Sequence, residues 1–163
     1  MVNQQLINPE SIVVVGASNN LTKPGGKLFY NLRTGTFMGE LYGLNPKEDS
    51  IQGLPCYHKV EEMPDADLAF LAVPAAYCLD IVRDLAASRK TRAFIIVSAG
   101  FSEENAEGST IEKELVALCA LYDAALIGPN CIGVLTPAYQ GIFTLPSPKL
   151  DSQGCDFISG SGA

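Results

Sequence analysis

The feature that most constrains the fold is a series of short apolar segments, each ended by turn-forming residues and followed by a helical or irregular stretch. The first is residues 11–16, Ser-Ile-Val-Val-Val-Gly, and the others are residues 39–44, 67–73, 93–97 and 124–127. Short apolar runs without polar alternation are typical of strands buried on both faces of a parallel sheet. Strands that alternate with helices of about ten residues form right-handed βαβ units. The sequence therefore predicts an α/β, Rossmann-like, doubly wound parallel sheet with helices on both faces.

The helices expected between these strands have recognisable spacing. A helix over residues 27–33 follows the first strand, with Gly35 as its stop. Tyr77, Ile81 and Leu85 are four residues apart and predict a second helix. Residues 109–112, Ser-Thr-Ile-Glu, have the form of a capping box and predict the start of a third. Its apolar stripe comprises Ile111, Leu115, Leu118, Cys119 and Tyr122.

The chain of 163 residues is long enough for one sizeable core. Residues 136–154 break into coil punctuated by proline and glycine. Residues 155–158 then predict a new strand, and residues 159–163 (SGSGA) a turn into a helix. We therefore expect one Rossmann-like domain over residues 1–135, with a linker and the start of a truncated second domain over residues 136–163.

Composition excludes several classes of protein. The net charge of −7 disfavours nucleic acid as a partner. No run of 18 apolar residues predicts a membrane span, and the N-terminus lacks the features of a signal peptide. The five cysteines are scattered and odd in number, which favours reduced thiols and a cytoplasmic location. His58 is the only histidine and no CxxC pair occurs, so no metal site is expected.

Ligands of open parallel sheets bind beyond the carboxyl ends of the strands. Five candidate segments follow the expected strands, although strand ends also need turn residues for purely structural reasons. The candidate residues are Gly16, Ala17, Ser18, Lys23 and Gly25 after the first strand; Lys47 after the second; Val73, Pro74 and Ala75 after the third; Ser98, Ala99 and Gly100 after the fourth; and Asn130 and Cys131 after the fifth.

The first two segments indicate what the ligand is. Glycines before a helix N-terminus favour a phosphate, because the backbone comes close and free N–H groups face it. The loop is longer than GxGxxG. An NAD-binding domain places a carboxylate after the second strand, whereas this chain has Asn45-Pro46-Lys47, where a lysine would attract a phosphorylated ribose. NADP, coenzyme A (CoA) and a simple exposed lysine all remain open at this point.

No catalytic constellation is readable. Cys131 has no histidine near it in sequence and is interpreted as structural, and His58 is interpreted as a turn or surface residue. The sequence contains no P-loop of the GxxxxGK[ST] type.

Five segments in order, residues 11–18, 44–47, 67–74, 95–101 and 127–133, resemble one known family. The chain resembles, over essentially its whole length, the N-terminal CoA-binding domain of the NDP-forming acyl-CoA synthetases, relatives of the succinyl-CoA synthetase α subunit. The resemblance implies coenzyme A as the cofactor, with CoA or acyl-CoA bound and a downstream ligase domain and an ATP-grasp domain or subunit as partners. The net charge and the lack of a long apolar run, rather than the resemblance, argue against nucleic acid and membrane as partners.

The resemblance also implies roles for the candidate residues. Gly16, Ala17 and Ser18 would lie against the pyrophosphate with Lys23 and Gly25, and Lys47 would approach the adenosine end. The residues after the third strand would line the adenine or ribose, those after the fourth would flank the pantetheine, and Asn130 and Cys131 would face the thioester end.

Two departures limit what this chain does by itself. The family often has Ser-Gln-Ser-Gly-Ala where residues 159–163 read SGSGA. The family's phosphorylated histidine lies in the following domain, and His58 does not match it. We therefore expect a fragment of an acid–thiol ligase without a complete active site. The alternatives are an NADP-binding oxidoreductase domain and a stand-alone regulatory CoA-binding protein.

Overall fold

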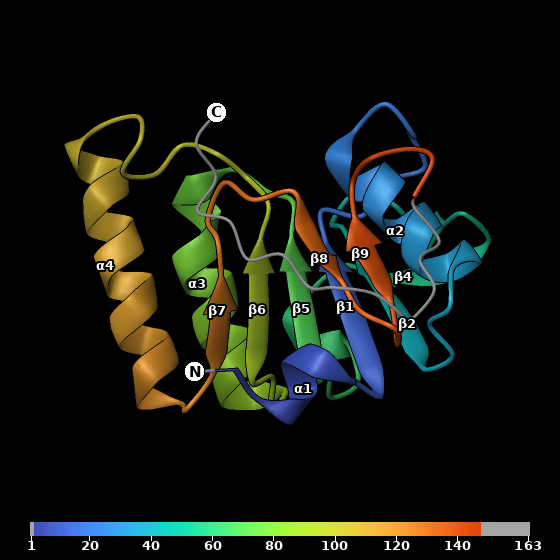
Figure 1. Cartoon of the computed structure of the whole chain (residues 1–163), viewed down its shortest axis with the longest axis horizontal. Helices are drawn as coiled ribbons and strands as arrows, with labels where there is room; N and C mark the ends of the chain where they lie inside the picture. The colour runs from blue at the N-terminus through green and yellow to red at the C-terminus, as the bar shows by residue number, and fades with distance from the viewer. Residues whose placement is uncertain (1, 148–163) are drawn as a thin grey trace.

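The computed structural model describes residues 2–147 and is organised around a seven-stranded sheet (Figure 1). In chain order the strands are β1 (Ser11–Val15), β2 (Glu40–Leu44), β3 (Ser50–Ile51), β4 (Leu54–Tyr57), β5 (Leu68–Leu71), β6 (Ala93–Ile96) and β7 (Ala125–Ile127). Their spatial order is β3-β4-β2-β1-β5-β6-β7. All neighbours pair in parallel except β3, which runs antiparallel to β4 at the sheet edge.

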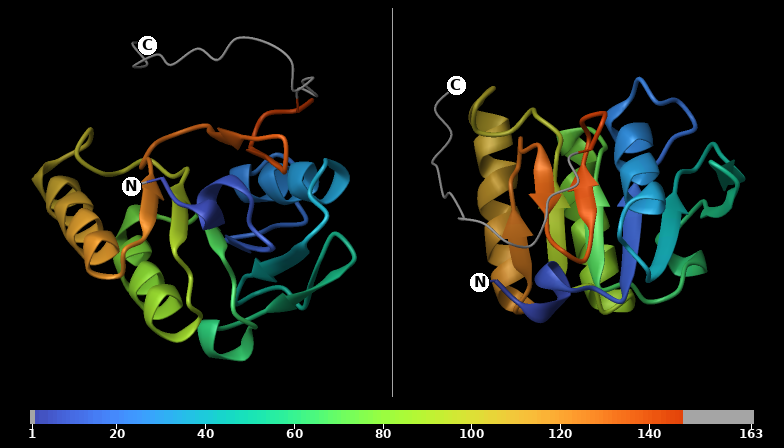
Figure 2. Two further views of the ribbon diagram at one scale, coloured as in Figure 1. Left: turned by 60° about the horizontal axis from the view of Figure 1, so that its bottom comes forward. Right: turned by 45° about the vertical axis from the view of Figure 1, so that its right-hand side comes forward.

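Two layers of elements cover this sheet. On one face lie α3 (Ala75–Ser88) and α4 (Ala106–Leu121), with a 3-10 turn, η1 (Val60–Glu62). On the other lie α1 (Gln4–Ile7), α2 (Pro24–Thr34) and the hairpin of β8 (Gly133–Leu135) and β9 (Gln140–Ile142). The two views in Figure 2 show the sheet between these layers. The doubly wound α/β fold expected from the sequence is confirmed.

Alternation along the buried strands explains why the core has two halves. In β1, Val13 and Val15 pack toward α3 and α4, whereas Ile12 and Val14 pack toward α2. Successive side chains of a strand point to opposite faces, so an all-apolar strand requires cover on both sides. Each of these four residues has at most 3% of its surface exposed, which shows that both covers are complete here.

Several local expectations were wrong. The capping box at residues 109–112 does not begin a helix, because α4 starts at Ala106, where the Asn105 side chain accepts from the N–H of Gly108 at 2.8 Å. Tyr77 is 62% exposed, and the buried stripe of α3 is instead Cys78, Val82 and Leu85. The helix after the first strand begins at Pro24 rather than at residue 27.

The coil expected over residues 136–154 is also incorrect in its first part. It contains β9, whose preceding residue Tyr139 is fully buried and donates its hydroxyl to the carbonyl of Leu6 at 2.7 Å. Asn31 of α2 donates to the carbonyls of Ile142 and Thr144 at 2.7 and 2.8 Å. The strand expected at residues 155–158 and the turn at 159–163 lie outside the described residues. The domain boundary at residue 135 stays a prediction.

Among residues 2–147, no helix has the length and apolar character needed to cross a membrane. Cys56, Cys78, Cys119 and Cys131 are free thiols.

Candidate functional site at the carboxyl edge of the sheet

The five strand-end segments meet at one edge of the sheet, the upper edge in Figure 1. Parallel pairing brings the carboxyl ends of β2, β1, β5, β6 and β7 side by side, so residues far apart in sequence become neighbours. Asn45 donates to the carbonyl of Ala17 at 2.8 Å, which joins the second segment to the first. Asn130 N–H donates to the carbonyl of Ser98 at 2.9 Å, which joins the fifth to the fourth.

Close backbone contacts explain the glycines of the first segment. Gly16 has φ of +80°, and a Cβ there would lie 2.5 Å from the carbonyl oxygen of Ala72 after β5. A Cβ on Gly25 would lie 2.1 Å from the carbonyl oxygen of Gly16. Any side chain at either position would therefore collide with the backbone. The first turn of α2 consequently sits directly against the end of β1.

The N-terminus of α2 has the properties of an anion site. Its N-cap residue, Lys23, makes no side-chain capping bond, and Pro24 occupies the first turn. The first N–H groups of a helix lack partners within the helix and carry a partial positive charge. The Ser18 hydroxyl, nearly buried, accepts from the N–H of Asn20 at 3.1 Å. In this turn Pro24 has no N–H, and the N–H of Gly26 donates to the Lys23 carbonyl at 3.1 Å. The groups of the turn that can face an anion are therefore the N–H of Gly25, the Ser18 hydroxyl and the exposed Lys23.

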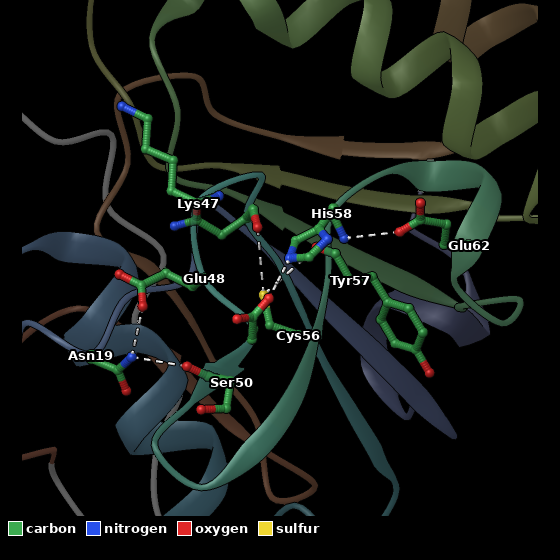
Figure 3. Close-up of polar contacts among 10 residues, drawn as sticks. Asn19, Lys47, Glu48, Ser50, Cys56, Tyr57, His58 and Glu62 are labelled. Carbon is green, nitrogen blue, oxygen red and sulfur yellow. Dashed lines mark hydrogen bonds and ion pairs between the residues drawn. The ribbon is translucent and has the colours of Figure 1, made fainter.

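Lys47 extends from the end of β2 with its ammonium free of local carboxylates. Its backbone N–H donates to the side chain of Asn45 at 3.0 Å, which fixes the turn. Figure 3 shows the Lys47 side chain directed away from the neighbouring Glu48. Among the ion pairs within residues 2–147, neither Lys47 nor Lys23 takes part. Both lysines are exposed and available to an anionic ligand.

Residues after β5 and β6 form the middle of the edge. Val73 faces Gly16, because a Cβ added to Gly16 would lie 2.9 Å from Cγ1 of Val73. Pro74 is the N-cap of α3. The Ala75 side chain approaches Gly100, which has φ of +103°. Ser98 and Gly100 are half-buried, while Ala99 is exposed.

A carboxylate that the sequence interpretation did not single out holds this middle part. Glu103 accepts from the N–H of Gly100 at 2.8 Å and from that of Phe101 at 3.2 Å. These bonds, led by the one from Gly100, lower the pKa of Glu103 below its ordinary value. The sequence carries no specific signal for this role, because only the folded turn brings the Glu103 carboxylate to these two N–H groups.

The last segment places Cys131 in a structural setting. Its thiol points to the carbonyl of Ile96 at 3.4 Å, and burial raises its pKa. A thiol with a raised pKa is a poor nucleophile at neutral pH. Asn130 is exposed, with φ of +53°.

The single histidine lies at the outer end of the same edge, after β4. His58 Nε2 is 3.2 Å from Asp49 Oδ1. The backbone N–H of His58 donates to the carboxylate of Glu62 at 3.3 Å (Figure 3). Its side chain is 43% exposed. Within residues 2–147, no group of three or more histidine, cysteine or acidic residues is placed to hold a metal ion.

Two surface hollows of the described residues lie away from this edge. One of about 330 Å³ lies between α3 and α4, with Leu79, Leu118 and Leu121 in its wall. Another of about 250 Å³ lies beside α2 and β9. The strand-end segments lie side by side along the sheet edge, an arrangement that suits an extended ligand laid across several loops.

An open parallel sheet with a glycine-lined helix N-terminus and a lysine after the second strand defines a nucleotide-binding α/β protein of the Rossmann-like class. Comparison with known proteins specifies the family. The model of the "CoA binding domain" family matches residues 10–137, and the chain belongs to this family.

Curated relatives are acyl-CoA-forming ligases. Trans-feruloyl-CoA synthase FCS1 from an unknown prokaryotic organism is 44% identical over 135 residues, which are 80% of this chain and 19% of the relative. Acetate–CoA ligase [ADP-forming] II of Archaeoglobus fulgidus is 36% identical over 81% of this chain and 20% of its own length. The chain thus spans about a fifth of these relatives.

A solved structure of an acetyl-CoA synthetase is similar to this chain in both fold and sequence. It is the dinucleotide forming acetyl-coenzyme A synthetase 1 of Ca. Korarchaeum cryptofilum, in complex with phosphate and ADP. It has a TM-score of 0.78 and 34% identity, over 86% of this chain and 30% of that one. Homology to NDP-forming acyl-CoA synthetases, which the sequence suggested, is confirmed.

Proposed function

We propose that this chain is the CoA-binding module of an NDP-forming acyl-CoA synthetase, which converts an acid, CoA and a nucleoside triphosphate to acyl-CoA, nucleoside diphosphate and phosphate. The observation that carries the proposal is the uncapped N-terminus of α2, packed against Gly16 through Gly25 at the carboxyl edge of the sheet. The remaining machinery would come from ligase and ATP-grasp domains or subunits. A cytoplasmic location is part of the proposal and rests on the cysteine pattern.

The proposed CoA contacts are distributed over the loops that follow five strands of the sheet. The pyrophosphate lies against Gly16–Ser18 and the first turn of α2, where backbone N–H groups and Lys23 compensate its charge. The 3′-phosphate of the adenosine end lies toward Lys47. Val73, Pro74 and Ala75 line the adenine or ribose. The pantetheine passes Ser98, Ala99 and Gly100, and its thiol end lies near Asn130 and Cys131.

The first expected result concerns ligand preference. At about 100 times its dissociation constant, CoA stabilises the folded chain by about 2.7 kcal/mol, because it binds only the folded state. For a domain of this size that is a rise in Tm of about 5–10 °C. Thermal melts with CoA, NADP, NADPH and NAD at equal concentration measure the difference. A clear shift with NADPH and none with CoA would favour the oxidoreductase alternative and reject the proposal.

The second expected result concerns Lys47. Lys47→Ala is expected to weaken the binding free energy of CoA by about 1.5–3 kcal/mol, the contribution of a well-formed charge-assisted contact. Dephospho-CoA lacks the 3′-phosphate, so its affinity changes little. Calorimetric titration of both ligands is the measurement, with Lys113→Ala on the exposed surface of α4 as a control for the lost charge. Equal losses for CoA and dephospho-CoA contradict the assigned role of Lys47.

A further inference from the structure

Asn19, in the loop after β1, bonds through its side chain to the edge hairpin of β3 and β4. Its Oδ1 accepts from the N–H of Gln52 at 2.7 Å. Its Nδ2 donates to the carbonyl of Ser50 at 2.9 Å and to the carboxylate of Glu48 at 3.1 Å (Figure 3). One short side chain thus ties its loop to three positions of the segment that leads into and through the hairpin.

Gln52, at the turn of the hairpin, bonds through its side chain back to the loop after β1 and to the start of α2. Its Nε2 donates to the carbonyl of Ser18 at 3.1 Å and to that of Gly26 at 2.9 Å. Two carbonyl acceptors identify this end of the carboxamide as the nitrogen. Gln52 has φ of +50°, a conformation uncommon for a residue other than glycine. The guanidinium of Arg33 donates to its carbonyl, which holds the turn against α2.

We define the phosphate loop as residues 16–26, from the end of β1 through the first turn of α2. The two carbonyls that accept from Gln52 flank the middle of this loop. Between them, residues 19–24 are exposed. Turn bonds from Thr22 and Lys23 to Asn20 hold the loop internally, whereas the bonds of Asn19 and Gln52 tie it to the edge hairpin. In a trans peptide the C=O and the following N–H point in opposite directions. The bond from Gln52 to the Ser18 carbonyl therefore turns the N–H of Asn19 away from the hairpin. The latch, defined as Asn19 with Gln52, thus fixes the direction of the peptide group between residues 18 and 19 and ties it to the start of α2.

We infer that Asn19 and Gln52 are positioning residues, which hold the phosphate loop in its pyrophosphate-binding conformation through the edge hairpin. This inference rests on the proposed function. Neither side chain needs to touch the ligand. A loop that samples other conformations binds with an affinity reduced by the fraction of competent molecules. Loss of the latch therefore slows association while leaving the contacts of the bound state, and so the dissociation rate, nearly unchanged.

The test compares Asn19→Ala and Gln52→Ala with the unaltered chain by stopped-flow binding of CoA and dephospho-CoA. Each variant is expected to lose affinity about tenfold, the size of one or two hydrogen bonds. The loss is in the association rate and is equal for both ligands, because both contain the pyrophosphate. Ser50→Ala removes a hydroxyl but keeps the carbonyl that accepts from Asn19, and is expected to bind as the unaltered chain does.

A charge-matched exchange covers the case in which an alanine variant fails to fold. Asn19→Asp places a carboxylate opposite Glu48 and slows association. Adding Glu48→Gln restores a donor–acceptor pair and the original net charge, so part of the association rate returns. Unchanged binding in folded latch variants, faster dissociation at an unchanged association rate, or no recovery in the exchange overturns the inference. No CoA binding by the unaltered chain instead rejects the proposed function.

Discussion

Gly25→Ala is expected to weaken CoA binding by about 10- to 100-fold. The added methyl group would lie 2.1 Å from the carbonyl oxygen of Gly16, and backbone cannot move aside as a flexible side chain does. Overpacking of this kind costs about 1–3 kcal/mol. The chain can relieve the collision by moving the start of α2 away from β1, but that movement separates the donors proposed to surround the pyrophosphate. Each 1.4 kcal/mol needed to restore them is a factor of about ten in the dissociation constant.

A matched variant separates this effect from a general loss of stability. A methyl group on Gly141 of β9 would lie 2.2 Å from the ring of Phe70, so Gly141→Ala is also overpacked, but in the core rather than at the carboxyl edge. It is expected to lower the Tm and keep CoA affinity in the folded chain. Calorimetric titration well below both melting temperatures makes the comparison. Full CoA affinity in Gly25→Ala would show that the first turn of α2 is not part of the site.

The parallel part of the sheet was predictable because its strands are buried on both faces. Such strands read as unbroken apolar runs, and the β1, β5 and β6 segments all do. The hairpin of β3 and β4 was missed because it lies at the sheet edge, is short, and contains Pro55. Such a segment has neither a strict alternation nor a continuous apolar run, so its pairing with β2 depends on the neighbouring strand rather than on its own sequence.

The β8–β9 hairpin was missed for a related reason. Its two strands have only three residues each, and glycines and Pro137 interrupt the apolar residues around them. Its place is set by Tyr139 and by Asn31 of α2, which lies more than 100 residues earlier. Contacts of such separation leave no periodic signal. The misplaced start of α4 shows a local failure, because Ser109 and Glu112 match the capping pattern while Asn105 performs the capping.

The location of the candidate site followed from a general rule, whereas its internal geometry did not. Carboxyl ends of parallel strands gather at one edge, so five strand-end segments could be placed together from sequence alone. Gly16 and Gly25 were chosen as glycines near a phosphate, and the structure adds that each is in contact with backbone. Asn19 and Gln52 carried no signal, because their partners lie on a hairpin that the sequence pattern did not reveal.

The 163-residue chain is expected to show no acyl-CoA synthetase activity by itself. Phosphoryl transfer to an acid needs a nucleophile or relay, a metal-held nucleotide and groups that stabilise charge in the transition state. The only histidine of the chain, His58, lies at the outer end of the edge and is paired with Asp49. Within residues 2–147, no cluster of three or more histidine, cysteine or acidic residues is placed to hold a metal ion. A CoA site positions a thiol, but a positioned thiol does not activate a carboxylate.

The measurement is formation of ADP or GDP that depends on added acid, with CoA, ATP or GTP, Mg²⁺ and a series of short-chain acids. The purified chain should give no product above the reaction without protein. Activity should appear when the ligase and ATP-grasp parts are joined to it or supplied as a separate subunit, because the chain spans only about a fifth of two acyl-CoA-forming relatives. In that assembly, Gly25→Ala should raise the KM for CoA, because its effect is on the CoA site. Turnover by the pure chain that His58→Ala abolishes would place the reaction on this edge, and would mean that a histidine interpreted as a surface residue is the phosphoryl carrier.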